Sequence, residues 1–401
     1  MSTEARDVLK PLTSLRFVAA LMVFVHHVPP AHAIAERLSF GYAGVGFFFV
    51  LSGFILTYAH HRRFGGALDM RAIREFYVAR IARIYPVHLA TTALALAWFV
   101  PFGAPQWDVS SAHERVAGFV AQALLVQSWS PSANVYGAGN PVSWSISVEA
   151  LFYALFPLAL CALLRATRRT SAGGLIALTA LACLAQDAVL CSAHVTPGIT
   201  WLLYRFPLAR LADFAVGMLI GLAFVRRTES NARVSGTALE LAAIAAVVTA
   251  IAALPMLPES LRYAAGLMPF WALLIGVFAL RSGAISRFAS HPWCVRLGEI
   301  SFAFYMVHWL VLNAEQHAFG WTNPTLALAT GLAVSIAASF ALFHGIETPA
   351  RRFIRTRFEA RLERAAGIEP ATLAWKARAL PLCNARARTE PVLRKQRRVS
   401  W

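Results

Sequence analysis

An arginine and a histidine stand at the two ends of one apolar stretch, RFVAALMVFVHH, which covers residues 16–27. Arg16 and His27 are eleven residues apart, close to three helical turns, so a helix would place them on one face, about 16 Å apart. His26 would be rotated from that line by roughly 80–100°. A titratable side chain in a membrane helix is costly, which makes it a functional candidate. The alternative is that Arg16 reaches the lipid headgroups and His27 is an ordinary interfacial histidine.

A second basic motif, YVARIARIYP, contains Arg80 and Arg83 one turn apart on one helix face. We expect both at the same membrane depth as Arg16, near the cytoplasmic edge. Guanidinium groups bind phosphate in a bidentate manner, so three converging arginines would form a site for the phosphate groups of a ligand. The competing interpretation is that Arg80 and Arg83 only mark the cytoplasmic side of the membrane.

One carboxylate, Glu149, lies in the stretch NPVSWSISVEALFYALFP. We expect it about 10 Å below the outer surface, at a depth similar to that of His27. A histidine paired with a carboxylate is oriented and made more basic, as a general base requires, so we predict His27 and Glu149 as catalytic residues. Alternatively, Glu149 bonds to nearby serine hydroxyls and fixes helix packing; these serines are Ser143, Ser145 and Ser147.

Other polar residues give weaker signals. Tyr305 and His308 share a face in FAFYMVHWL, where a packing role is the commoner one for a histidine. Arg205, Arg210 and Asp213 are expected near the outer half of the sixth span, where Arg210 and Asp213 are spaced to neutralise one another.

Long apolar helices are needed to position these residues. Of the 401 residues, 58% are hydrophobic and only 14% are charged, and apolar blocks of roughly 17–23 residues have the length that crosses a bilayer. We therefore predict an all-α bundle of about ten membrane-spanning helices, at residues 11–29, 41–60, 85–102, 142–164, 174–191, 205–225, 237–255, 262–280, 297–315 and 327–345. The stretch 115–129 is short for a span, so we expect an interfacial or re-entrant helix there.

Basic residues set the predicted orientation. Arginine clusters between the apolar blocks, for example in residues 61–84, place both termini in the cytoplasm. This distribution indicates that the net charge of +17 serves membrane topology and not nucleic-acid binding. We expect a transmembrane domain over residues 1–355 and a basic, disordered cytoplasmic tail over 356–401. A cleaved signal peptide with residues 17–25 as its core is the alternative for the N-terminus, but Arg16 favours a retained first span.

In their order and spacing, these motifs resemble acyltransferase family 3, the bacterial membrane O-acyltransferases that modify O-antigen, peptidoglycan, nodulation factors and macrolides. The resemblance covers roughly residues 10–355 and rests on LTSLRFVAALMVFVHH, GVGFFFVLSGFIL, FYVARIARIYP, WSISVEALFY, RLADFAVG, ISFAFYMVHW and GIETPARR. The Arg/Lys-x10-His motif of the family falls on Arg16 and His27. Its Arg-x-x-Arg motif falls on Arg80 and Arg83, and its glutamate falls on Glu149.

The resemblance implies an O-acyltransferase of the bacterial inner membrane, with lipids around it. Such an enzyme moves an acyl group, usually acetyl, from acetyl-CoA on the cytoplasmic side to a hydroxyl of a glycan, such as lipopolysaccharide, on the outer side. The CoA phosphates would lie at the three arginines. His27 would deprotonate the acceptor or carry the acyl group transiently. We expect acyl-CoA as a substrate, with no permanently bound cofactor or metal.

Acceptor choice is expected in the outer segment 103–141, whose aromatic residues Trp107, Trp129 and Tyr136 suit sugar rings. The main alternative function is a secondary transporter or flippase of a glycan or small anion, because polar residues at mid-membrane also occur in carriers. The two halves of the sequence show no internal repeat, which favours the enzyme. A membrane sensor without catalytic activity is a third reading.

Overall fold

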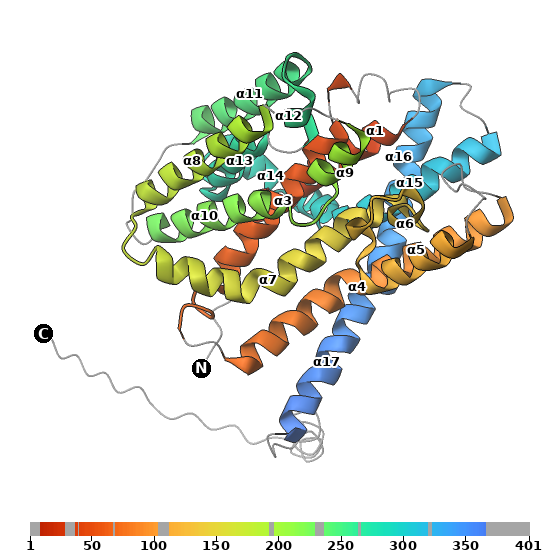
Figure 1. Ribbon diagram of the computed structural model, residues 1–401, viewed down its shortest axis with the longest axis horizontal. Helices are drawn as coiled ribbons and strands as arrows, with labels where there is room; N and C mark the ends of the chain where they lie inside the picture. Colours follow the sequence, from red (N-terminus) through yellow and green to blue (C-terminus); the bar gives the residue numbers. More distant parts are fainter. Residues whose placement is uncertain are drawn as a thin grey trace, which may run out of the picture. The chain divides into compact units, whose positions relative to one another are not determined.

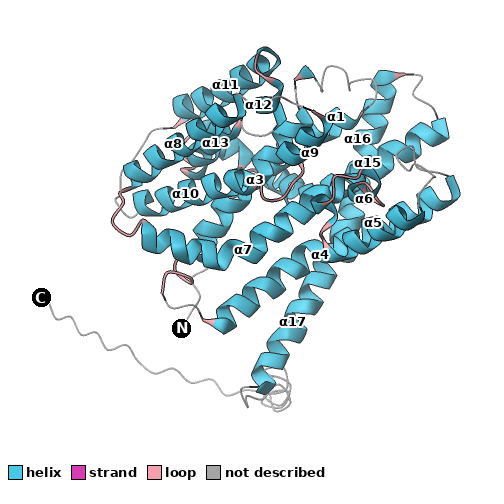
Figure 2. Cartoon of the chain, viewed as in Figure 1, coloured by secondary structure: helices cyan, strands magenta, loops and turns pink. Residues whose placement is uncertain are grey.

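The computed structural model describes residues 9–28, 37–38, 40–66, 69–102, 112–191, 196–228, 236–263, 266–319 and 323–365. Every regular element in these ranges is helical, which confirms the predicted all-α class (Figure 2). The chain divides into two compact units, residues 1–351 and 352–401, and the candidate site lies in the first. Residues 356–365 of the tail predicted to be disordered are helical, and the rest of the tail, from residue 366 onward, lies outside the described residues.

Figure 1 shows the order of the helices along the chain. The α-helices are α1 Lys10–His27, α3 Phe40–His60, α4 Met70–Phe102, α5 Ala112–Leu124, α6 Ala133–Tyr136, α7 Trp144–Ala166, α8 Ala172–Cys191, α9 Pro197–Tyr204, α10 Leu211–Thr228, α11 Thr237–Ala253, α12 Glu259–Tyr263, α13 Met268–Ala279, α14 Ala284–Ala289, α15 Pro292–Phe319, α16 Pro324–Leu342 and α17 Thr348–Ala365. Three 3₁₀ turns, η1 Gln127–Trp129, η2 Pro141–Ser143 and η3 Leu254–Met256, and a π-helical turn, η4 Phe343–Glu347, lie between them.

Seven helical stretches of the described chain are long and apolar enough to cross a membrane, so the protein is an integral membrane protein. They are Phe40–His60, Pro141–Ala166, Ala172–Cys191, Thr237–Met256, Glu259–Ala279, Pro292–Phe319 and Thr325–Phe358. The predicted number was about ten. The other three predicted spans fall on helices α1, α4 and α10, which contain charged residues, for example Arg16, Arg80 and Asp213. Charged residues count against a helix as a membrane span, although in α4 they all lie before the predicted span 85–102.

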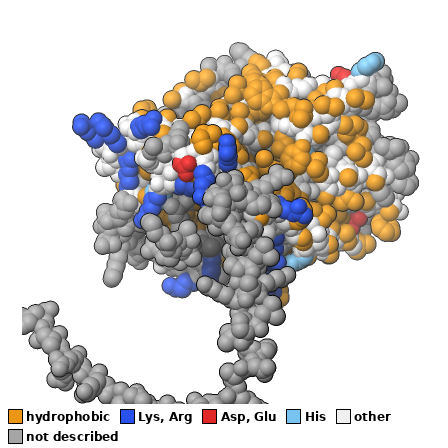
Figure 3. Space-filling view, turned by 90° about the horizontal axis from the view of Figure 1, so that it is seen from below, with side chains coloured by type: hydrophobic (Ala, Val, Ile, Leu, Met, Phe, Trp, Pro, Cys, Tyr) orange, Lys and Arg blue, Asp and Glu red, His pale blue; other side chains and the backbone are white. Residues whose placement is uncertain are grey.

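The surface fits a lipid environment. Figure 3 shows hydrophobic side chains over much of the displayed face, with Lys and Arg gathered toward one side of it. Large apolar residues on the spanning helices are widely exposed, among them Leu184 at 66% and Val189 at 70% on α8. Contiguous apolar exposure of this kind is expected where acyl chains cover the protein.

The ambiguous stretch 115–129 is helical only as far as Leu124, where α5 ends, and continues as a short 3₁₀ turn, η1. The 13 residues of α5 extend about 20 Å, too short to cross the hydrocarbon core. Val116 and Val120 are exposed on this helix, whereas Gln122 is fully buried and donates a hydrogen bond to the carbonyl of Ala138. Glu114 on the same helix accepts hydrogen bonds from Ser132 and Asn134, so α5 has polar anchors as well as exposed apolar residues.

Glycines bring the central helices into close contact. A Cβ atom added to Gly217 on α10 would overlap the carbonyl oxygen of Val50 on α3, and one added to Gly53 would overlap the carbonyl oxygen of Phe214. A Cβ at Gly298 on α15 would overlap the backbone of Thr13 on α1. These glycines let α3 pack on α10 and α1 pack on α15, and α1 and α15 carry the two histidines described below.

Candidate active site

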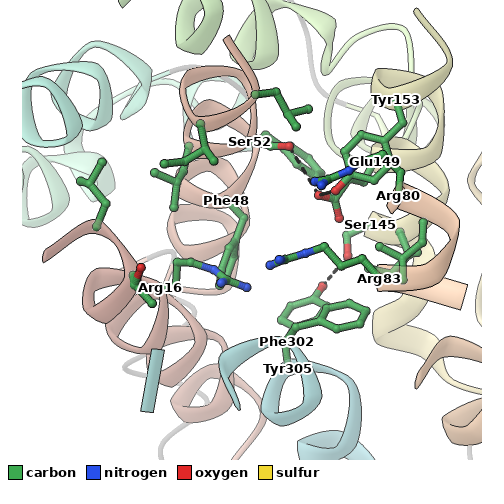
Figure 4. A pocket seen from close by; sticks show the side chains of 18 of the residues that line it. Arg16, Phe48, Ser52, Arg80, Arg83, Ser145, Glu149, Tyr153, Phe302 and Tyr305 are labelled. Atoms are coloured by element: carbon green, nitrogen blue, oxygen red, sulfur yellow. Dashed lines mark hydrogen bonds between the residues drawn. The ribbon is translucent and has the colours of Figure 1, made fainter. Parts of the chain in front are cut away.

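The first feature of the site is a cavity of about 370 Å³ between α1, α3, α4, α7 and α15, here called the inner cavity (Figure 4). It brings together four of the residues singled out in the sequence: Arg16, Arg80, Arg83 and Glu149. Three guanidinium groups and one carboxylate among its lining residues leave an excess of positive charge. A cavity of this kind attracts an anion such as a phosphate group.

The arginines reach the inner cavity from opposite walls. In Figure 4, the Arg16 side chain on α1 and the Arg83 side chain on α4 extend toward each other across the space. Two cations that face each other repel, and a bound anion between them would remove this repulsion. Their separation in sequence is large, so only the tertiary packing of the bundle, in which α1 and α4 both contact α15, creates this arrangement.

Aromatic rings hold Arg80 in place. Its guanidinium carbon lies 5.7 Å from the ring centroid of Phe76 and 5.6 Å from that of Tyr153, both within cation–π range. The Nε atom of Arg80 is buried and has no hydrogen-bond partner among the described residues. A buried donor without a partner is costly, and an acceptor oxygen of a ligand would satisfy it.

Glu149 has different partners from the one expected. Its carboxylate accepts a short hydrogen bond from the hydroxyl of Tyr153, one turn further along α7, and a long one from Ser52 on α3, at 3.4 Å. Glu149 lies in the inner cavity, while His27 lies in a second cavity with another histidine beside it. Glu149 and His27 were expected at similar depths, but Glu149 lies with Arg16, which is at the other end of α1 from His27.

Glu347 is a further acidic residue near the arginines that sequence reasoning did not assign to the site. It is 2% exposed, in the π-helical turn η4, and its carboxylate interacts electrostatically with Arg16 and Arg83. Arg351 lies 3.8 Å away. The only signal in the sequence was an acidic residue in GIETPARR, which reads equally well as an ordinary helix end.

The second cavity, of about 260 Å³, is here called the outer cavity and contains His27. Arg205 and six aromatic residues also line it; the aromatic residues are Tyr42, Tyr136, Trp144, Tyr204, Tyr305 and Trp309. The guanidinium of Arg205 lies 4.7 Å from the ring centroid of Tyr136 and 5.2 Å from that of Tyr204. Rings and a guanidinium donor can stack on and hydrogen-bond to a hydroxyl-rich ligand.

The two cavities share two lining residues, Val45 on α3 and Tyr305 on α15. The hydroxyl of Tyr305 lies 2.9 Å from the carbonyl oxygen of Val142 and 2.8 Å from the hydroxyl of Ser145. These bonds fix the ring at the boundary between the cavities. A ligand lying along α1 from the arginines toward His27 would pass this ring.

His27 contacts a second histidine. Its Nδ1 atom lies 2.8 Å from the carbonyl oxygen of Val23 and 3.1 Å from Nε2 of His308. His308 is fully buried, and its Nδ1 lies 2.7 Å from the carbonyl oxygen of Tyr305. The spacing of Tyr305 and His308 marked the residue in the sequence, but nothing there identified its partner.

The remaining polar candidates have structural partners or lie elsewhere. Arg210 and Asp213 form an ion pair at 3.2 Å, with both side chains 1% exposed, which confirms their mutual neutralisation. Arg210 also donates to the carbonyl oxygen of Tyr263. Of the outer aromatics predicted for acceptor choice, Tyr136 lines the outer cavity and Trp129 packs on Phe206. Trp107 lies outside the described residues.

Comparison with known proteins agrees with the motifs. Residues 11–344 match the acyltransferase domain of family 3. The chain is 31% identical to acyltransferase MdmB of Streptomyces mycarofaciens, over 87% of this chain and 93% of that protein. It is 27% identical to O-acetyltransferase OatA of Staphylococcus aureus, over 39% of this chain and 25% of that protein. No solved structure matches. The family match spans most of the chain, and the chain therefore belongs to acyltransferase family 3.

Proposed function

We propose that the protein transfers an acyl group, most simply acetyl, from acyl-CoA in the inner cavity to a hydroxyl of a carbohydrate-containing acceptor in the outer cavity. The observation that carries the proposal is the pair of adjoining cavities, one lined by three arginines and the other by His27. An acyl-CoA donor has the matching shape, with anionic phosphates at one end and a thioester on a long flexible arm at the other.

The proposed donor site follows from charge. Arg16, Arg80 and Arg83 would hold the CoA phosphates, because guanidinium groups form strong charge-assisted hydrogen bonds with phosphate oxygens. Along α1, Arg16 and His27 are separated by about 16 Å of helical rise, a distance that the pantetheine arm can cover. The arm would lie past Tyr305, which lines both cavities.

The proposed chemical step takes place at His27. The acceptor hydroxyl gives its proton to Nε2 of His27 while its oxygen attacks the thioester carbonyl. The carbon–sulfur bond then breaks, the acyl group stays on the acceptor oxygen, and the proton passes from His27 to the departing thiolate. A transient acyl-histidine on the same nitrogen is the second route, and a rapid chemical quench that recovers acylated protein would reveal it.

The proposed topology has ten spans, with α1, α4 and α10 added to the seven apolar stretches, and both termini in the cytoplasm of a bacterial inner membrane. Positive-inside loops support this arrangement. It places the arginine-lined cavity toward the cytoplasm, where acyl-CoA is made, and His27 toward the outside. The carboxylates of Glu149 and Glu347 would then partly neutralise the positive charge of the donor site.

The test uses purified protein in proteoliposomes with [¹⁴C]acetyl-CoA, here called the transfer assay. An extract of the source cells lacking the gene supplies the acceptor, whether lipid-linked or soluble. We expect ¹⁴C label in carbohydrate-containing material, with one free CoA released for each acetyl group transferred. Label that crosses the bilayer without cleavage of the thioester would instead support the transporter, and no transfer at all would contradict the proposal.

A further inference from the structure

His27 and His308 contact each other, and the hydrogen-bond acceptors around the two rings set which nitrogen of each imidazole carries the proton. His308 is buried between α1 and its own helix α15, with the ring of Phe304 stacked beside it at 6.1 Å and that of Phe24 at 6.3 Å. Its two ring nitrogens have unlike neighbours. Nδ1 faces backbone carbonyl oxygens, and Nε2 faces His27.

The carbonyl oxygens fix the tautomer of His308. Nδ1 lies 2.7 Å from the carbonyl oxygen of Tyr305 and 3.3 Å from that of Phe304. A carbonyl oxygen only accepts hydrogen bonds, so Nδ1 must carry the hydrogen atom. In the neutral ring, Nε2 of His308 is then unprotonated and presents a lone pair to His27.

The tautomer of His27 is fixed in the same way, by a backbone carbonyl oxygen together with Nε2 of His308. Its Nδ1 faces two acceptors, the carbonyl oxygen of Val23 at 2.8 Å and Nε2 of His308 at 3.1 Å. Nδ1 of His27 therefore carries its hydrogen atom, and Nε2 has the lone pair. The other tautomer would place three acceptor lone pairs together in a buried space, which is strongly unfavourable.

We propose that His308 is a positioning residue for His27: it holds the imidazole with Nδ1 protonated and Nε2 ready to accept a proton. This inference rests on the proposed role of His27 as the base. The arrangement has the logic of a catalytic triad, with a neutral histidine in the place of the usual carboxylate. When Nε2 takes the proton of the acceptor hydroxyl, the Nδ1–H to His308 bond becomes charge-assisted and stabilises the imidazolium.

A neutral partner suits the position. A carboxylate buried between α1 and α15 would need a cation or several donors to offset its desolvation. His308 accepts one hydrogen bond and donates another to the backbone, so it is satisfied in an apolar environment without a charge. This also explains why Glu149 is not needed beside His27 and lies with the arginines.

Three substitutions separate orientation of His27 from packing. In His308→Gln, the longer amide reaches the former position of Nε2, so its oxygen can accept from His27. In His308→Asn, the shorter amide retains the donor to Tyr305 but does not reach His27. His308→Leu fills space without polar atoms. We expect Gln to keep kcat within about threefold in the transfer assay, while Asn and Leu lower it about tenfold to hundredfold, less than loss of the base itself.

Further measurements keep the outcomes distinct. The KM for acetyl-CoA should stay constant in all three variants, because the arginine cavity is unchanged. His308→Asn in a His27→Ala background should cause no additional loss of transfer, since the two residues act as one unit. If His308→Leu does not fold, the difference in kcat between His308→Gln and His308→Asn still tests the inference. Wild-type kcat in His308→Asn, or an equal loss in Asn and Gln, would overturn the inference.

Failure of the inference and failure of the proposed function have different signatures. If His27→Ala abolishes transfer while His308→Asn retains it, His27 is still the base and His308 is only a packing residue. If His27→Ala retains full transfer, the proposed function is wrong, whatever His308 does.

Discussion

The hydroxyl of Tyr305 on α15 lies 2.8 Å from the hydroxyl of Ser145 on α7, at the boundary where the inner and outer cavities meet. Tyr305 lines both cavities, and Ser145 lines the inner one. A donor that enters from the arginines must place its thioester beside this ring to reach His27. The pair therefore stands where a transferase has to pass an acyl group while keeping water out.

Tyr305→Ala should loosen this boundary. Removal of the ring joins the two cavities, so water reaches a bound thioester, and we expect hydrolysis of acetyl-CoA without acceptor to rise about tenfold. Tyr305→Phe keeps the ring but loses the bonds to Val142 and Ser145, so hydrolysis should stay low while stability falls by about 1–3 kcal/mol. Thiol release measures the first effect and thermal unfolding the second. Equal, low hydrolysis in both variants would argue against a boundary at Tyr305.

Arg80→Ala/Arg83→Ala should weaken binding of acetyl-CoA at least about tenfold per arginine, because each charge-assisted bond to phosphate contributes about 1.5–3 kcal/mol. Equilibrium binding of [¹⁴C]acetyl-CoA to the detergent-solubilised protein measures this directly and needs no acceptor. Arg74→Ala is the matched control, since Arg74 lies exposed on the same helix and does not line the cavity. Unchanged affinity for acetyl-CoA in the double variant would show that Arg80 and Arg83 do not bind the CoA phosphates.

Glu149→Gln distinguishes two roles for this carboxylate. In the structure it bonds to Tyr153 and Ser52 inside the arginine cavity. Removing its negative charge should therefore leave kcat within about fivefold of wild type and tighten acetyl-CoA binding slightly, because less negative charge faces the phosphates. If Glu149 oriented His27 instead, kcat would fall by about 10² or more at constant donor affinity.

The Arg210–Asp213 pair gives a prediction about stability. Both side chains are buried, so Asp213→Ala leaves a guanidinium without its counter-ion and should destabilise the protein by about 3–5 kcal/mol. The double variant Arg210→Met/Asp213→Ala removes both charges and should recover much of this loss. Thermal unfolding in detergent checks both variants. A double variant no more stable than the single one would show that Arg210 matters for something besides this pair.

The sequence was sufficient for those features that depend on one helix at a time. Helical phase predicted Arg16 and His27 on one face of α1, and apolar block length located the seven stretches that are long and apolar enough to cross a membrane. These inferences need only the geometry of a single helix and the thickness of a bilayer. Charge clusters indicated which arginines would lie at one membrane depth, but it is the packing of the helices that brings Arg16, Arg80 and Arg83 to one cavity.

Features that depend on how helices pack against each other could not be read in this way. Glu149 was expected beside His27 because both were assigned similar depths, but the packing of α7 in the bundle places Glu149 in the cavity that contains Arg16. His308 became the neighbour of His27 through the packing of α1 on α15, which Gly298 permits. Partner choice between helices distant in sequence is set by tertiary packing and leaves no local pattern.

The role of His27 as the base is tested most directly by the rate of acetyl transfer by His27→Ala, with acetyl-CoA binding measured on the same preparation. We expect transfer to fall by about 10²–10⁴, as for loss of a general base, while the affinity for acetyl-CoA remains that of the wild type. His317→Ala, an exposed histidine at the far end of α15, should transfer at the wild-type rate. Full transfer by His27→Ala would show that His27 is not the base.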